Sequence, residues 1–139
     1  MRATLILRIA AFVNLLFAAG HTVGFLTFRP ASTEGQAALK AMAVVFAEKG
    51  TRFSYAGFYR GFGLTCGLAM LLIAAWSWWL GDLVKTAPRS IVPPLVMLFV
   101  YQLGGLALAS LYFPVPAIVF SAILPILYAL ALAGALRAR

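Results

Sequence analysis

The sequence predicts an all-α integral membrane protein, a four-helix bundle with one short extra interfacial helix in the first connection. Of the 139 residues, 64% are hydrophobic and 10% are charged, whereas soluble domains hold roughly 45–50% apolar residues. Four long apolar runs alternate with short polar segments, and each run has about the 20 residues that a helix needs to cross a bilayer. The chain is therefore expected to form a single transmembrane domain, residues 1–139.

The first span is expected over residues 9–28, because this stretch carries no formal charge and follows the basic Arg2 and Arg8. A basic start, an apolar run and small residues at Ala18 and Gly20 are also typical of a cleavable signal peptide. The apolar run continues well past any cleavage point there, which favours a retained helix. Cleavage of an N-terminal signal stays the alternative.

The connection after Pro30 is expected to hold a short helix over residues 34–49. Thr33 and Gln36 have the spacing of a capping box, in which a hydroxyl at the helix start accepts a backbone N–H and the later side chain reaches back. The apolar part of this stretch is too short to cross a bilayer, and Gly50 is a typical helix stop. The helix is therefore predicted to lie at the interface or to cover the bundle as a lid.

The other three spans are expected at residues 56–80, 93–112 and 116–136. The second span begins among aromatic residues and ends with three tryptophans, an arrangement typical of the aromatic belts at the two membrane interfaces. The third span opens with two consecutive prolines, which suit the first turn of a helix because their missing N–H groups cost nothing there. The last two spans are separated by a short turn and should form a hairpin.

Basic residues beside the spans predict the orientation. An even number of spans puts both termini on one side of the membrane, and that side carries more Lys and Arg than the other. Because cytoplasmic loops carry an excess of these residues, both termini are expected in the cytoplasm, and for a bacterial source the helical spans indicate the inner membrane. The net charge of +8 is spread beside the apolar runs rather than gathered in a patch, so no nucleic-acid partner is expected.

Polar residues inside the spans are expected to face the interior of the bundle, because they cost energy against lipid. Successive spans cross the bilayer in opposite directions, so the number of residues from a span end gives the depth of each polar residue. By this measure several polar residues lie in the half of the bilayer next to the first connection, and others lie near its middle. These residues predict a cavity that is centred on His21 and opens toward that connection. The candidate pocket residues are His21, Asn14, Thr22, Tyr59, Arg60, Gln102 and Ser121.

Small residues and one proline predict where helices pack. Gly57 with Gly61, and Gly63 with Gly67, are two small-xxx-small pairs that let another helix approach closely, either within one bundle or in a dimer. Pro125 removes one backbone hydrogen bond of the fourth span and is expected to kink it. Two interpretations of Pro125 stay open: it only shapes the helix for packing, or the carbonyl that it leaves without a partner lines a polar pocket.

His21 is the only histidine and lies within the first span. Three interpretations stay open: a hydrogen bond to a carbonyl or a polar neighbour, contact with a ligand or a role in acid–base chemistry, and ligation of a haem or metal. No second histidine supports the last of these, and Cys66 is the only cysteine, so neither a metal nor a cofactor is expected. No Asp or Glu lies inside any predicted span, which weakens acid–base catalysis and proton-coupled export.

The chain contains the segments GHTVGFLTF at residues 20–28 and FYRGFGL at residues 58–64. Together these segments resemble a family of small bacterial four-span membrane proteins that has no assigned activity. In size and layout the chain is also loosely similar to small four-span proteins of the DoxX type. The family resemblance implies a four-helix membrane fold over the whole chain and supplies no reaction. Its signature positions would be His21, Thr22, Gly24, Phe58, Tyr59, Gly61 and Gly63.

Three functions are compatible with these features. The favoured one is an accessory membrane component or a binder of an apolar ligand, such as a lipid or quinone, with a pocket near His21. The alternative is a small membrane enzyme that acts on an apolar substrate, with His21 as the acid–base group and Glu34, Glu48 or Tyr59 as its partner. A small transporter is the least favoured. The expected partners are membrane lipids, an apolar small molecule, and a homo-oligomer or a larger membrane complex.

Overall fold

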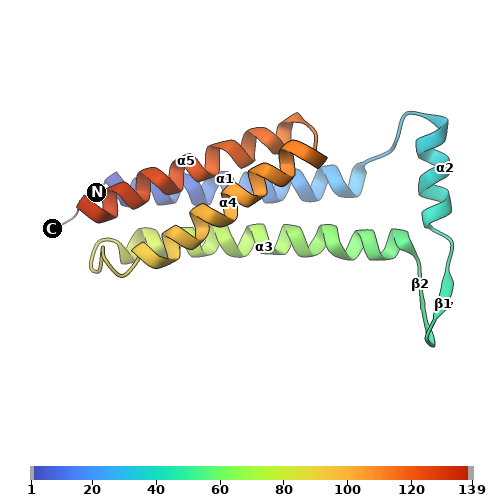
Figure 1. The fold of residues 1–139 in the computed structure, drawn as a ribbon, viewed down its shortest axis with the longest axis horizontal. Helices are drawn as coiled ribbons and strands as arrows, with labels where there is room; N and C mark the ends of the chain where they lie inside the picture. The colour runs from blue at the N-terminus through green and yellow to red at the C-terminus, as the bar shows by residue number, and fades with distance from the viewer. Residues whose placement is uncertain (1, 138–139) are drawn as a thin grey trace. The chain divides into compact units, whose positions relative to one another are not determined.

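The computed structural model describes residues 2–137 and confirms the predicted fold class. Within that range there are five helices and one β-hairpin, in the order α1, α2, β1, β2, α3, α4, α5 (Figure 1). Four helices are long and apolar enough to cross a membrane, which makes the chain a multi-pass membrane protein with four spans. These are α1 (Arg2–Thr27), α3 (Tyr55–Leu83), α4 (Val92–Tyr112) and α5 (Val115–Arg137).

The long helices contain nearly all of the predicted spans but differ from them at their ends. Helix α1 begins at Arg2 rather than at residue 9, and α3 begins one residue before and ends three residues after the predicted range of 56–80. The basic residues of α1 do not stop the helix, because long cationic side chains keep their charged ends in the headgroup region while the stems stay along the apolar surface. Helix α4 has its two prolines in the first turn, where they were expected.

The helix predicted over residues 34–49 is wrong in its second half. Helix α2 (Thr33–Met42) is followed by an antiparallel hairpin of β1 (Phe46–Glu48) and β2 (Thr51–Phe53). Lys49 and Gly50 form the turn with positive φ angles of 48° and 82°, as the commonest two-residue hairpin turn requires. Gly50 is therefore a turn residue and not a helix stop.

The start of α2 differs by one residue from the predicted capping box. Ser32 is the N-cap, since its Oγ accepts a hydrogen bond from the Gly35 N–H at 3.1 Å, and Thr33 is already helical. The side-chain amide of Gln36 donates to the Pro30 carbonyl at 3.3 Å instead of closing the box. A hydroxyl one position earlier satisfies an unpaired N–H of the first turn equally well, so the pattern predicted the helix start to within one residue.

The chain divides into two compact units. The first comprises the described residues of Met1–Ala18 and Met70–Arg139 and contains parts of all four long helices. These helices pack around one apolar core whose fully buried members include Leu7 of α1, Leu80 of α3 and Leu124 of α5. Within this unit, the beginning of α1, the connection from α3 to α4, and the end of α5 lie at the same end (Figure 1).

The second unit comprises Ala19–Ala69, which holds the end of α1, helix α2, the hairpin and the beginning of α3. Phe46 packs edge-on against Phe53 across the hairpin, with ring centroids 4.5 Å apart, and lies 5.2 Å from the ring of Tyr55 at the start of α3. Ser54 caps α3, because its Oγ accepts a hydrogen bond from the Gly57 N–H at 3.1 Å. The hairpin is thus fastened to the first turn of α3.

Candidate functional site

His21 lies on α1 in the second unit and is bonded to the backbone of α3. Its Nε2 lies 2.9 Å from the Gly63 carbonyl oxygen. Because a carbonyl oxygen only accepts, the ring donates its Nε2–H, and in the neutral ring this leaves Nδ1 as an acceptor. The half-buried ring also stacks on Phe25, with centroids 6.0 Å apart and an interplanar angle of 8°. Among the three interpretations of His21, the structure supplies a partner for the first, a hydrogen bond to a carbonyl.

Phe25 connects His21 to Tyr59, and we call these three residues the His21 cluster. The rings of Phe25 and Tyr59 lie 5.2 Å apart at an angle of 51°, a tilted arrangement that aromatic pairs favour. Tyr59 is 55% exposed. The neighbouring Phe58 and Phe62 are also exposed and lie 4.9 Å apart. The cluster thus combines one polar ring with aromatic faces that neighbouring lipid or a ligand can contact.

Side chains of α1 pack against α3 at Gly63 and Gly67. A methyl group on Gly63 would lie 2.5 Å from the Phe25 ring, and one on Gly67 would lie 2.9 Å from Thr22 Oγ1. Both distances are well inside van der Waals contact, which for carbon atoms is roughly 3.5–4.0 Å. This small-xxx-small pair therefore allows the two helix segments to approach closely within the second unit.

The other pair of glycines has different surroundings. Within the described range, a methyl group on Gly61 would meet nothing within 4 Å, and one on Gly57 would meet only the capping Ser54 Oγ, at 3.3 Å. Arg60 lies on the same stretch of α3 and is exposed, without an ion pair to any residue between 2 and 137. This part of α3 is thus open toward its surroundings.

Asn14 belongs to a buried chain of hydrogen bonds in the first unit. Its Nδ2 donates to the Ala10 carbonyl at 2.9 Å and to the Tyr128 hydroxyl at 3.0 Å. Ser77 Oγ donates to the Ile73 carbonyl at 2.7 Å and lies 2.6 Å from the Tyr128 hydroxyl. Because Ser77 has one proton and uses it on Ile73, the Tyr128 hydroxyl donates to Ser77. The hydrogen bonds therefore all run in one direction, from Asn14 on α1 through Tyr128 on α5 to Ser77 on α3.

We call Asn14, Ser77 and Tyr128 the three-helix network. All three side chains are buried, which means that each hydrogen bond replaces one that water would otherwise make. The sequence pointed to Asn14 as a polar residue facing inward. It missed Ser77, because that residue stands between two tryptophans in a stretch assigned to the aromatic belt. The signal that would have found it is a lone hydroxyl in an apolar run.

The seven predicted pocket residues are distributed over both units. Gln102 on α4 and Ser121 on α5 are buried in the same unit as Asn14. Pro125 is also buried, and α5 continues through it. The remaining four lie in the second unit: His21, Thr22, Tyr59 and Arg60. A single cavity that joins all seven stays a prediction.

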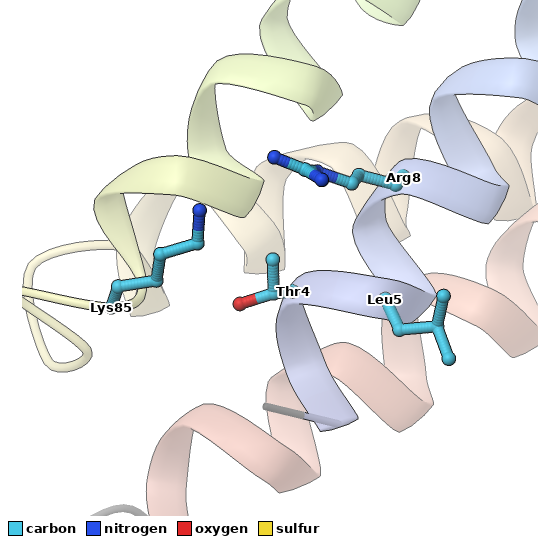
Figure 2. Close-up of a pocket in the computed structure, with 4 residues that line it drawn as sticks. All are labelled: Thr4, Leu5, Arg8 and Lys85. Carbon is cyan, nitrogen blue, oxygen red and sulfur yellow. The ribbon is translucent and has the colours of Figure 1, made fainter.

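A depression of about 460 Å³ lies in the first unit, between the beginning of α1 and the residues after α3 (Figure 2). It is lined by Thr4, Leu5, Arg8 and Lys85. Both cations bond to Oδ1 of Asp82, with Arg8 Nη2 at 3.1 Å and Lys85 Nζ at 2.6 Å. The sequence identified Arg8 only as a basic residue before the first span, since its spacing from Lys85 did not show that the two would meet.

Across residues 2–137, no three His, Cys, Asp or Glu side chains are grouped in a way that could hold a metal ion. Comparisons with protein-family models, curated proteins and solved structures gave no match to this chain. The family resemblance in the sequence therefore stays a prediction.

Proposed function

We propose that this membrane protein is a binding or accessory component that holds an apolar ligand with a polar group, such as a lipid or quinone, against the His21 cluster. The observation that carries the proposal is the divided role of the His21 ring. One nitrogen is occupied by the Gly63 carbonyl, which fixes the ring, while Nδ1 is left as an acceptor. A polar group within a span that is not fully used by its own bundle is a functional hypothesis by default.

The aromatic surroundings support an apolar ligand. Phe25 stacks on His21 and contacts Tyr59, so that the cluster offers aromatic faces beside its polar atoms. Aromatic rings provide large apolar contact area, and a tyrosine adds a hydroxyl at its outer end. A ligand with an apolar body and one hydroxyl or carbonyl group fits this combination, because its polar group would pair with His21 Nδ1 or with the Tyr59 hydroxyl.

The alternative of a membrane enzyme has less support from the same contacts. A histidine in acid–base catalysis works with a second titratable group within hydrogen-bond reach. In the described part of the chain, the polar contact of His21 is with a backbone carbonyl, and Phe25 packs against both His21 and Tyr59. Glu34 and Glu48 are exposed on α2 and β1 and make no ion pair in that range. These contacts favour binding over proton transfer.

The substitution Tyr59→Phe is expected to lower retention of the bound apolar molecule about fivefold, because it removes a hydroxyl whose net hydrogen bond contributes about 1 kcal/mol. The packing of the ring on Phe25 is kept. The protein is extracted with its native membrane in polymer-bounded discs, and the co-purified small molecules are quantified by mass spectrometry. The matched control is Tyr101→Phe on α4, since both tyrosines are 55% exposed. Equal retention in the two variants, or no molecule enriched above bulk lipid, would contradict the proposal.

We further infer that both termini face the cytoplasm of a bacterial cell. Arg2, Arg8, Lys85, Arg89 and Arg137 belong to the end of the first unit where α1 begins and α5 finishes (Figure 1), with Asp82 as the one acidic residue at that end among residues 2–137. An excess of Lys and Arg in the short segments beside spans favours the cytoplasmic side.

Cysteine labelling tests the orientation. The native Cys66 is exposed and is first replaced by alanine. In that background, Lys85→Cys is expected to react with a membrane-impermeant maleimide only after the cells are opened, and Lys40→Cys is expected to react in intact cells. The two sites serve as controls for each other, because the single span α3 lies between them and places them on opposite sides. Labelling of Lys85→Cys from outside would reverse the orientation.

A further inference from the structure

We propose that the depression lined by Thr4, Leu5, Arg8 and Lys85 binds the phosphate group of an anionic membrane lipid. This site is independent of the His21 cluster, since it lies in the first unit and shares no residue with it. Figure 2 shows Thr4 and Arg8 on neighbouring turns of α1 and Lys85 just beyond the end of α3, on the other side of the depression. Three donor groups from two segments of the chain thus border one space.

A close approach of the two helix backbones builds the site. A methyl group on Gly81 of α3 would lie 3.5 Å from the Thr4 carbonyl oxygen and 3.7 Å from Arg8 Cγ. These are ordinary van der Waals distances, so α1 and α3 are direct neighbours at this level. Arg8 reaches Asp82 at the next position of α3. Thr4 and Arg8 are four residues apart, so their side chains lie on the same face of α1.

The charges at the site leave an excess of positive charge and of donors. Two cations share a single carboxylate, and both bond to the same oxygen of Asp82. A guanidinium has five N–H groups and an ammonium has three, but within residues 2–137 each cation makes this one side-chain bond. The Nε atom of Arg8 is buried without a hydrogen-bond partner in the same range. A phosphate group offers several charged acceptor oxygens, which is the chemistry that such a donor set recognises.

The position of the site favours a lipid over free phosphate. The guanidinium carbon of Arg8 lies 4.8 Å from the ring centroid of Trp78, and tryptophan is enriched at the level of the headgroups. This cation–π contact places the guanidinium beside a residue type that marks the headgroup level. Leu5 is exposed at the edge of the depression, so an apolar surface borders the polar one. A phosphate joined to a glycerol and an acyl chain matches both surfaces.

Other basic residues at the same end attract anionic lipids in a general way, and the experiment must separate the two effects. Arg137 is exposed near the end of α5 and does not line the depression. It lies within the same unit and carries the same charge as Lys85. The substitutions Lys85→Gln and Arg137→Gln therefore remove one positive charge each, but only the first removes a cation that lines the depression.

The test is native mass spectrometry of the full chain in detergent, titrated with phosphatidylglycerol or with phosphatidylcholine. The unaltered protein is expected to bind phosphatidylglycerol in preference. Lys85→Gln is expected to weaken this binding about fivefold, because it removes the bond from the ammonium to the phosphate inside the depression. Arg137→Gln is expected to change it less than twofold. Thr4→Val keeps the charge and removes a hydroxyl, so it should weaken binding about threefold, and it supplies a second variant if Lys85→Gln fails to fold, as checked by circular dichroism.

Three results would overturn the proposal. The first is equal weakening by Lys85→Gln and Arg137→Gln, which would reduce the site to general attraction by the charged end. The second is equal binding of the two lipids. The third is displacement of phosphatidylglycerol by inorganic phosphate at the same concentration, which would show that the depression recognises the free anion and not the lipid.

Discussion

The substitution Tyr128→Phe is expected to lower the free energy of unfolding by about 1–2 kcal/mol. The Tyr128 hydroxyl accepts a hydrogen bond from Asn14 and donates one to Ser77, and all three side chains are buried. Removing it leaves an Asn14 N–H and a Ser77 lone pair without partners in an apolar interior, where they cannot turn to water. The measurement is unfolding in mixed micelles with increasing sodium dodecyl sulfate, followed by circular dichroism.

A matched control and a double substitution define this prediction. Tyr112→Phe makes the same chemical change at a tyrosine that is 74% exposed, and it should alter the free energy by only a few tenths of a kcal/mol. Combining Tyr128→Phe with Asn14→Leu should cost less than the sum of the two single changes, because both break the same hydrogen bond. Strict additivity, or equal effects of the two tyrosine substitutions, would show that the three-helix network does not hold the helices together.

The fold could be predicted from the sequence because a bilayer leaves few choices to the backbone. Every N–H and C=O group in the apolar layer must be paired within the chain, so an apolar run of about 20 residues becomes a helix. The helix ends were predicted less well, as the start of α1 at Arg2 illustrates. Outside the apolar layer water can satisfy the backbone, and the apolar pattern no longer determines where a helix stops.

The hairpin after α2 shows a different limit. Leu39, Met42 and Phe46 have helical spacing, and a glycine at position 50 suits the end of a helix as well as a hairpin turn. What distinguishes the two conformations is the packing of Phe46 against Phe53 and Tyr55. That contact exists only once the connection has folded back on itself, so a local pattern could not reveal it.

For the candidate sites, the sequence predicted which polar residues would be buried but not which atoms they would contact. Polar residues inside spans have to avoid lipid, and Asn14, Gln102 and Ser121 are indeed buried. Their partners depend on how each helix is rotated and how deep each residue lies. The Gly63 carbonyl that accepts from His21 is a backbone atom, which no residue pattern identifies. Nor does the spacing of Arg8 and Lys85 show that both would reach Asp82.

The substitution Gly63→Val should be among the most damaging single changes in the second unit. A side-chain carbon at Gly63 would lie 2.5 to 2.7 Å from three atoms of the Phe25 ring. That ring cannot move aside without cost, because it stacks on His21 and contacts Tyr59. Forcing extra atoms into a packed contact costs about 1–3 kcal/mol. The expected result is a loss of that size in the free energy of unfolding, measured by the same detergent titration, together with weaker ligand retention at the His21 cluster.

Gly61→Val is the matched control, because it makes the same change on the same helix where nothing in the described range lies within 4 Å. Any effect of valine on the helix itself is common to both variants, so their difference isolates the contact with α1. Adding Phe25→Ala to Gly63→Val should restore part of the lost stability by making room for the new side chain. Equal losses in the two valine variants, without rescue, would mean that α1 does not pack against Gly63 in the membrane.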